Sequence, residues 1–271
     1  PMNPRPPDGA IATRDLCRRF GPVTAVEPLT LEVQAGRIHG LLGSNGAGKT
    51  TLIKMLTTLL PPSEGDALVA GASILDAPRQ VRQRIGYVPQ MLSADGSLTA
   101  RENLLFSARL YGVAARDRAA RIAEALRFMG LEEAAGRLVK TYSGGMIRRL
   151  ELAQAMLHRP EVLFLDEPTI GLDPLARRAV WERLQELRRQ WGTTILITTH
   201  DMEEADALCD ELSLMHQGRI AARGTSAELK AGIGPEATLE DVFAQVAGGT
   251  IEAGGSYRDV SRARRVARRL A

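Results

Sequence analysis

The stretch Gly43-Ser44-Asn45-Gly46-Ala47-Gly48-Lys49-Thr50 has the residue types and the spacing of a loop that surrounds a polyphosphate. Its glycines permit unusual backbone dihedral angles, with which consecutive N–H groups can point at phosphate oxygens. We expect Lys49 to reach the β- and γ-phosphates and the Thr50 hydroxyl to take one coordination position on Mg²⁺, with Thr51 as a second hydroxyl. A plain glycine-rich turn before a helix is the alternative.

Two acidic residues follow the apolar run at residues 162–165, which has the composition of a buried strand. Asp166 and Glu167 should therefore lie at the carboxyl edge of a central strand, where ligands of α/β sheets bind. Asp166 suits the coordination shell of Mg²⁺, and Glu167 is placed to polarise an attacking water molecule. Capping of the next helix is the structural alternative, but the loop at residues 43–50 already requires a metal ligand.

One histidine has a position that suggests chemistry. His200 follows the expected strand at residues 194–199 and so reaches the same sheet edge as the two acids, where it is a candidate to contact a γ-phosphate. His39 lies inside an expected strand. His158 and His216 fall in expected turns, and we expect both to be solvated.

A second glycine-rich segment precedes a helical pattern. Ser143-Gly144-Gly145 stands directly before apolar residues at helical spacing, which places a serine and two glycines at a helix N-terminus. Such an end is a second potential anion site. An ordinary serine cap followed by flexible glycines is the alternative.

These side chains need a sheet and helices that position them. The loop at residues 43–50 lies between a strand at 38–42 and a helix at 51–59, and shorter strands are expected at 11–16 and 29–33. The fold class is therefore α/β, with a P-loop NTPase (RecA-like) core, an N-terminal antiparallel β region and an inserted helical subdomain. The expected divisions are a flexible segment 1–10, a core 11–90 and 159–225, a helical subdomain 91–158 and an extension 226–271.

Bulk composition limits the functional classes. The 271 residues, 44% hydrophobic and 25% charged, are typical of a soluble globular protein that can bury a full core. No apolar stretch approaches the length of a membrane span, and the start lacks a signal-peptide pattern. Cys17 and Cys209 indicate neither a disulfide framework nor a metal site, which fits a reducing cytoplasm. A net charge of +3 is too small to imply nucleic acid.

The C-terminal part carries the positive charge. A hairpin is expected at residues 212–222 and a capped short helix after Thr225. The last 22 residues contain six arginines against Glu252 and Asp259, a net charge of +4. Ser256 and Asp259 could cap a final basic amphipathic helix, which would contact an anionic membrane or a partner, or else be solvated.

Taken in order, the motifs at residues 43–50, 90, 143–145, 166–167, 173 and 200 resemble those of ABC transporter ATP-binding subunits, over about residues 11–225. Within that family the chain looks like the drug-export ATPases of the daunorubicin-resistance type. The residues that carry this closer resemblance are Tyr142-Ser143-Gly144-Gly145-Met146 and Leu239-Glu240-Asp241-Val242-Phe243. Tyr142 and Met146 replace the commoner Leu and Gln of the family.

The resemblance implies roles for individual residues. Phe20, where the family commonly has Tyr, would stack on adenine, and Gln90 would link the metal and the γ-phosphate to a membrane partner. Ser143 and Gly145 would grip an ATP held by the opposite subunit. Asp173, which by its position before Pro174 is a helix N-cap, belongs to the same set of nucleotide-site residues.

The resulting hypothesis is a Mg²⁺-dependent ATPase that acts as a head-to-tail dimer and powers a separate membrane permease, with export of a drug-like or hydrophobic compound. It would be cytoplasmic, held at the inner face of the membrane by that permease. One alternative is a soluble ABC-type ATPase that switches conformation on nucleic acid or ribosomes. Another is a nucleotide sensor that does not hydrolyse ATP, which Glu167 and His200 disfavour.

Overall fold

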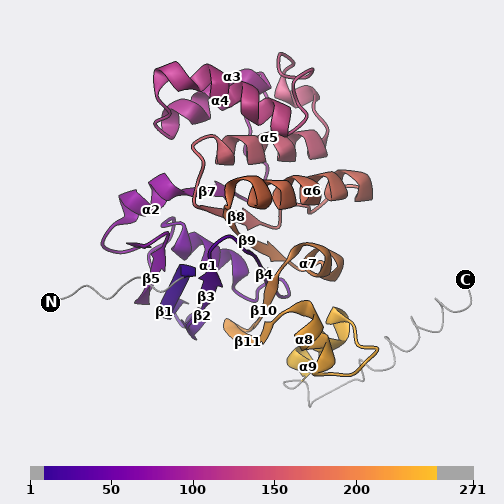
Figure 1. The fold of residues 1–271 in the computed structure, drawn as a ribbon. Helices are drawn as coiled ribbons and strands as arrows, with labels where there is room; N and C mark the ends of the chain where they lie inside the picture. The colour runs from indigo at the N-terminus through magenta and orange to yellow at the C-terminus, as the bar shows by residue number, and fades with distance from the viewer. Residues whose placement is uncertain (1–8, 249–271) are drawn as a thin grey trace, which may run out of the picture.

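The computed structural model describes residues 9–248, which form two β-sheets with helices around them (Figure 1). The central sheet contains β4 (Ile38–Leu42), β7 (Ile85–Val88), β8 (Val162–Asp166), β9 (Thr194–Thr199), β10 (Glu211–His216) and β11 (Arg219–Gly224). Their order across the sheet is β11-β10-β4-β9-β8-β7. All neighbours pair in parallel except β10 and β11, which form a hairpin. The predicted α/β core is confirmed.

Both faces of this sheet are covered, as the apolar run of β8 predicts. Val162 and Phe164 face a cluster that includes the helix after the phosphate loop, α1 (Lys49–Leu56). Leu163 and Leu165 face the opposite cluster, which is built from later helices. Side chains that alternate between two cores hold β8 in one register, because a slip of one residue would exchange the two sets.

The second sheet is antiparallel and packs over α1, as predicted for the N-terminal region. Its strands are β1 (Gly9–Phe20), β2 (Val23–Leu29), β3 (Glu32–Gln34), β5 (Glu64–Val69) and β6 (Ala72–Ser73). The order is β2-β1-β5-β6, with β3 also paired to β1. The helix α1 is therefore buried between this sheet and one face of the central sheet.

The predicted strand at residues 29–33 is wrong, because the chain is interrupted there. Thr13 Oγ1 donates to Leu29 O at 3.0 Å and accepts from Leu31 N at 2.8 Å. A side chain thus takes ladder positions that a strand partner would otherwise fill. β2 consequently ends at Leu29, and the separate strand β3 pairs with an earlier part of β1.

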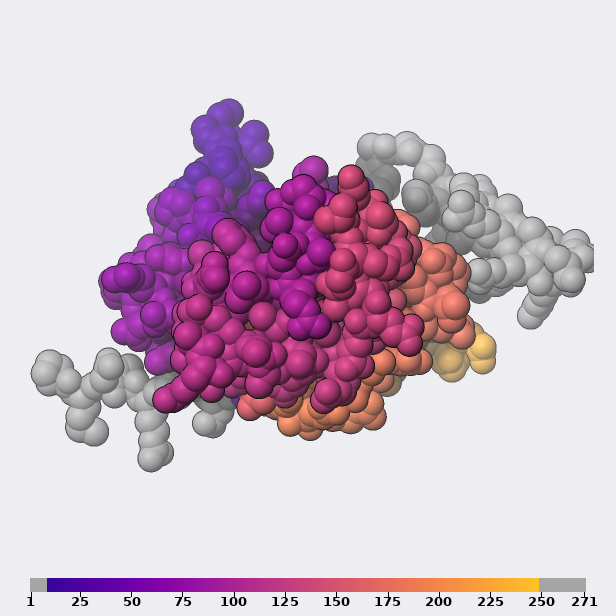
Figure 2. Space-filling view, turned by 90° about the horizontal axis from the view of Figure 1, so that it is seen from above, coloured from indigo at the N-terminus to yellow at the C-terminus, as the bar shows by residue number. Residues whose placement is uncertain are grey.

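The segment between β7 and β8 is helical, as predicted. It contains α3 (Ala100–Leu110), α4 (Ala115–Phe128) and α5 (Gly144–Met156), with α6 (Pro174–Trp191) packed next to it (Figure 1). A capping box begins α3: Thr99 Oγ1 accepts from the backbone N–H of Glu102, and the Glu102 carboxylate accepts from the backbone N–H of Thr99. Seen from above, the magenta helices α3 and α4 cover the middle of the molecule (Figure 2).

The remaining helices are short. They are α2 (Pro78–Arg84), which the sequence patterns do not predict, α7 (Met202–Leu208), α8 (Ser226–Ala231) and α9 (Leu239–Gly248). The β10–β11 hairpin turns at Gln217 and Gly218, both with positive φ, and Thr225 caps α8. The proposed final helix near Ser256 lies outside the described residues. No helix within residues 9–248 combines the length and the hydropathy needed to cross a membrane.

Two histidines pack against other residues of the fold, His39 fully buried and His158 half-buried. His39 in β4 lies 2.9 Å from Ser213 Oγ, and burial lowers its pKa to about 4, so its ring is neutral at pH 7. The prediction that His158 is solvated is wrong. Its ring stacks on Tyr111 with centroids 4.1 Å apart, it contacts Ile85 O, and burial lowers its pKa.

Candidate nucleotide and metal site

The loop at residues 43–48 connects β4 to α1, as predicted, but its glycines have two different functions. Gly48 has φ of 105°, and a Cβ there would lie 2.5 Å from Ala25 O. Gly43 has no positive φ; it is required because a Cβ would lie 2.5 Å from Met215 O. The expectation that Gly43 supplies an unusual dihedral is therefore wrong, and close packing against β10 is the reason for that glycine.

This loop lines an open cleft of about 330 Å³. The N-cap residue of α1 is Gly48, which has no side chain that could accept a hydrogen bond. The N–H groups of the first turn of α1 therefore remain directed at the cleft. They place positive partial charge where a phosphate would bind. The lining residues are Ala25, Ser44, Asn45, Gly46, Ala47, Gly48, Lys49, Thr50, Thr51, Gln90 and Glu167.

Lys49 is held inside the loop. Its Nζ donates to Gly43 O at 2.8 Å and to Ser44 O at 3.1 Å, and lies 3.4 Å from Glu167 Oε1. Its side chain is only 5% exposed. The ammonium group is thus oriented by backbone carbonyls and paired with one carboxylate at the base of the cleft.

Asp166 meets the requirements of a metal ligand. Thr50 Oγ1 and Thr198 Oγ1 donate to its Oδ1 at 3.1 and 2.6 Å. Its Oδ2 is buried and has no hydrogen-bond partner within residues 9–248. A buried carboxylate oxygen left free beside a hydroxyl suits Mg²⁺, which binds proteins through one or two oxygens together with phosphates and water. No cluster of three His, Cys, Asp or Glu side chains exists in the described part of the chain, so the oxygens of a nucleotide would complete such a site.

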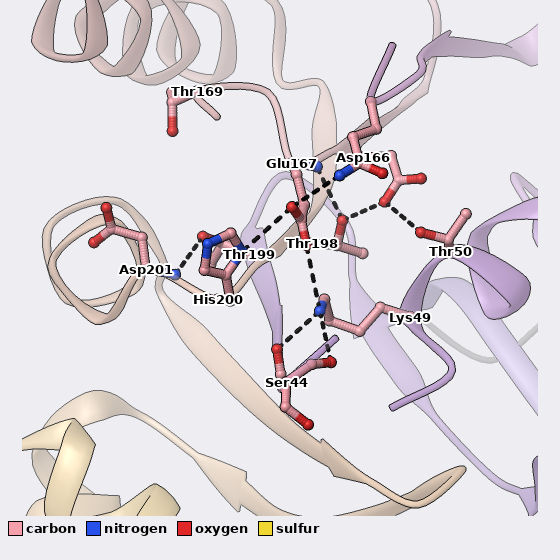
Figure 3. A network of polar contacts seen from close by, with 12 residues as sticks. Ser44, Lys49, Thr50, Asp166, Glu167, Thr169, Thr198, Thr199, His200 and Asp201 are labelled. Carbon is pink, nitrogen blue, oxygen red and sulfur yellow. Dashed lines mark hydrogen bonds and ion pairs between the residues drawn. The ribbon is translucent and has the colours of Figure 1, made fainter. Parts of the chain in front are cut away.

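Glu167 is at the centre of the polar network in Figure 3. Its φ is 48°, a strained value for a residue with a Cβ, and its backbone N–H is held by Thr198. Its Oε2 lies 3.2 Å from Gln90 Nε2 and 3.3 Å from His200 Nδ1. The site therefore gathers Lys49, Gln90 and His200 around one carboxylate, as the sheet-edge argument predicts for Glu167 and His200.

A buried acid behind this network connects its loops. Glu204 of α7 is 1% exposed and accepts from Thr169 Oγ1 at 2.7 Å and from Trp181 Nε1 at 2.9 Å. Burial raises its pKa, and the hydrogen bonds from Thr199, Thr169 and Trp181 oppose that rise. Thr169 lies in the loop that follows β8 and carries Glu167, and Trp181 belongs to α6. Glu204 of α7 therefore connects that loop to α6.

The second glycine-rich segment lies apart from the cleft. Ser143 is the N-cap of α5 and its hydroxyl accepts from Met146 N at 3.3 Å, as the cap alternative predicts. A Cβ at Gly145 would lie 2.8 Å from Ala176 Cβ, which places the segment against the start of α6. Asp173, the N-cap of α6, is thereby close to Ser143-Gly144-Gly145. Within residues 9–248, the lining of the Lys49 cleft does not include Ser143, Gly144, Gly145 or Asp173.

Phe20 occupies the end of β1 and its side chain is not part of the core. The residue is 46% exposed, and the Arg18 guanidinium carbon lies 4.6 Å from the centre of its ring. Within residues 9–248, Phe20 does not line the cleft, although Ala25 of the neighbouring strand β2 does. An accessible aromatic ring is available for stacking.

Three residues of this site are missing from the sequence-based candidates. Thr198 cannot be distinguished in the sequence, because it is one of several β-branched residues in an ordinary strand pattern. Ala25 lines the cleft through a strand that is distant in sequence. Glu204 resembles a solvated acid in the first turn of a short helix, and only the topology buries it.

Comparison with known proteins gives the family. The family model described as ABC transporter matches residues 26–170. The daunorubicin/doxorubicin resistance ATP-binding protein of Streptomyces peucetius is 45% identical over 84% of this chain and 69% of its own length. A Nod factor export ATP-binding protein I of Burkholderia lata is 48% identical over 80% of this chain and 71% of its own length.

A solved structure supports the same assignment. The structure of an ATP binding subunit of an ABC transporter is 30% identical, with a TM-score of 0.78, and the match covers 88% of this chain and 99% of that one. The phosphate loop thus lies between a strand and a helix, and the paired acids lie at the carboxyl end of a central strand, as the family resemblance implies. The chain belongs to the ABC transporter family, as an ATP-binding subunit that hydrolyses ATP.

Proposed function

We propose that the cleft binds Mg²⁺-ATP and that Glu167 is the general base of its hydrolysis. Lys49 and the N–H groups of residues 43–50 would hold the β- and γ-phosphates. Thr50 and Asp166 would hold Mg²⁺, with Gln90 as a further ligand; the ion would neutralise charge that develops on the phosphates. Support comes from the free buried Oδ2 of Asp166.

In this mechanism Glu167 orients an attacking water and accepts its proton. The Glu167 carboxylate lies beside Lys49 and Gln90 and lines the cleft, which is the geometry a base needs. His200, 3.3 Å from the same carboxylate, would contact the γ-phosphate from the opposite side. The strained backbone of Glu167 fixes the base where small displacements would reduce the rate.

We propose that two copies of the chain bind head to tail. The observation that supports this is the position of the Ser143 helix end. It is a helix N-terminus, where an anion can bind, but it is not among the described residues that line the Lys49 cleft. In a head-to-tail pair, Ser143-Gly144-Gly145 of one subunit would contact the γ-phosphate bound by the other, with Asp173 beside it. Phe20 would stack on the adenine of its own subunit's ATP.

The work done by this pair is proposed to be export through a separate membrane permease. Support comes from the relatives, which are described as a drug-resistance protein and as a Nod factor export protein. The chain would then lie in the cytoplasm at the inner face of the membrane, with residues 91–158 as a helical subdomain next to the permease. A drug-like or hydrophobic compound is the proposed cargo.

Removal of the metal tests the core of this proposal. The purified chain should release phosphate from ATP when Mg²⁺ is present, and excess EDTA should reduce the release to background while added Mg²⁺ restores it. Phosphate release in a colorimetric assay is the measurement, with EDTA plus excess Mg²⁺ as the matched control. Binding of ATP without any phosphate release would instead support a sensor.

A further inference from the structure

Helix α5 contains an ion pair that is almost completely buried. Arg148 Nη1 lies 2.9 Å from Glu151 Oε2, and both side chains are 2% exposed. Arg148 is the largest side chain in the described part that is essentially inaccessible. Arg148 and Glu151 lie five and eight residues after Ser143, the N-cap of the same helix.

The partners of this pair belong to the loop that carries Gln90. Arg148 donates from Nη1 to Pro89 O and from Nη2 to Gln90 O, both at 2.8 Å. Glu151 Oε1 accepts from the backbone N–H of Ser93 and, at 3.1 Å, from its hydroxyl. The loop is thus gripped on both sides of Gln90 by charged groups from one helix.

A buried pair of this kind is not needed merely to hold the helix in place. Burial lowers the pKa of Arg148, which shows the cost of removing the guanidinium from water, and Glu151 offsets only part of it. Replacing a buried ion pair with apolar side chains of similar volume is often neutral or stabilising, so charge is not a requirement for packing. A planar guanidinium, in contrast, fixes the position and direction of two carbonyl groups at once.

Gln90 connects this contact to the nucleotide site. Its side-chain Nε2 donates to Glu167 Oε2 at 3.2 Å, while its backbone carbonyl is held by Arg148. The same helix begins at Ser143, the residue proposed to contact the other subunit's ATP. One rigid helix therefore joins the loop of one nucleotide site to the anion-binding end that serves the second.

We propose that Arg148 and Glu151 are positioning residues that couple the two nucleotide sites of the dimer. Through this pair, a movement of α5 would shift the Gln90 side chain relative to Glu167 and the Ser143 helix end at the same time. The inference rests on the proposed head-to-tail dimer. It differs from a purely structural role, in which the pair would affect folding and leave the geometry of Gln90 unchanged.

The test compares four variants of the full chain: Arg148→Met, Glu151→Leu, both together, and Arg149→Met. Arg149 is the matched control, because its guanidinium is on the same helix and donates to Met129 O at 3.0 Å without touching the Gln90 loop. Steady-state phosphate release gives kcat and the KM for ATP, and thermal melting reports folding.

Arg148→Met should lower kcat by about 10- to 100-fold with the KM for ATP changed by less than about twofold, because Gln90 is misplaced while the phosphate loop is intact. The double variant should melt higher than either single variant, since no unpaired buried charge remains, and yet retain the low kcat. Arg149→Met should keep the parent kcat. With Glu167→Gln added, Arg148→Met should also raise the ATP concentration needed for dimer formation, and Arg149→Met should not.

If the double variant regained the parent kcat as well as a higher melting temperature than the single variants, the inference would be overturned. The pair would then be only a structural anchor. Equal kcat values for Arg148→Met and Arg149→Met would overturn it as well. Absence of phosphate release from the unmodified chain would be a different result, because it contradicts the proposed function itself.

Discussion

Replacing Glu167 with glutamine is expected to lower kcat by at least about 100-fold, because an amide cannot accept the proton of the attacking water. ATP binding should be preserved. The substitution keeps the shape of the side chain and removes a negative charge beside the phosphates, while Lys49 remains bonded to the loop carbonyls. With ATP bound and hydrolysis blocked, the variant should accumulate as a dimer.

Phosphate release and size-exclusion chromatography with and without ATP measure the two effects. Glu161→Gln is the matched control, since Glu161 is exposed and lies just before the opposite end of β8. The control should hydrolyse ATP normally and show no ATP-stabilised dimer. Undiminished turnover in Glu167→Gln would refute the assignment of this residue as the base.

Replacing Lys49 with alanine is expected to remove both binding and hydrolysis. A charge-assisted hydrogen bond is worth about 1.5–3 kcal/mol, so loss of the ammonium should weaken ATP binding by about 10- to 100-fold. Hydrolysis should fall to background, because the same group would neutralise charge on the γ-phosphate. Glu167, which is 7% exposed, would also lose its ion-pair partner.

Equilibrium binding of a fluorescent ATP analogue and phosphate release are the measurements for this variant. Lys54→Ala provides the control, since Lys54 is an exposed lysine on the same helix. Unchanged affinity in Lys49→Ala would show that the cleft binds nucleotide without this side chain, contrary to the mechanism proposed here.

Local features of this fold can be predicted from sequence because their physics acts over three or four residues. The caps at Ser143, Asp173 and Thr225 all form as their spacing indicates. The paired acids and His200 are also correct, since parallel strands bring their carboxyl ends to one edge.

The remaining features depend on contacts between distant segments. Thr13 interrupts a strand through its side chain, and no periodicity in residues 29–33 signals that. The helix α2 has a single buried residue, Val81, and so lacks the apolar repeat that identifies longer helices.

Buried charged residues cannot be recognised from the local sequence. Arg148 and Glu204 look like solvated residues of amphipathic helices, and only the tertiary structure encloses them. The Arg148 contact to the Gln90 loop spans 58 residues of sequence, so no local pattern can reveal it. Gly43 is similar, because its requirement comes from a carbonyl of β10.

Each nucleotide site is proposed to be shared by two subunits, with Lys49 from one and Ser143 from the other. Mixing two inactive proteins tests it directly. Lys49→Ala lacks the near side of each site and Ser143→Glu the far side, so a mixed dimer contains one site with both parts intact.

Each variant alone should be inactive. An equal mixture should recover up to about a quarter of the unmodified rate, for random pairing and independent sites. Phosphate release from the mixture is the measurement, with each variant at the same total concentration as its control. A mixture no more active than its components would show that Lys49 and Ser143 do not act on the same ATP across a subunit interface.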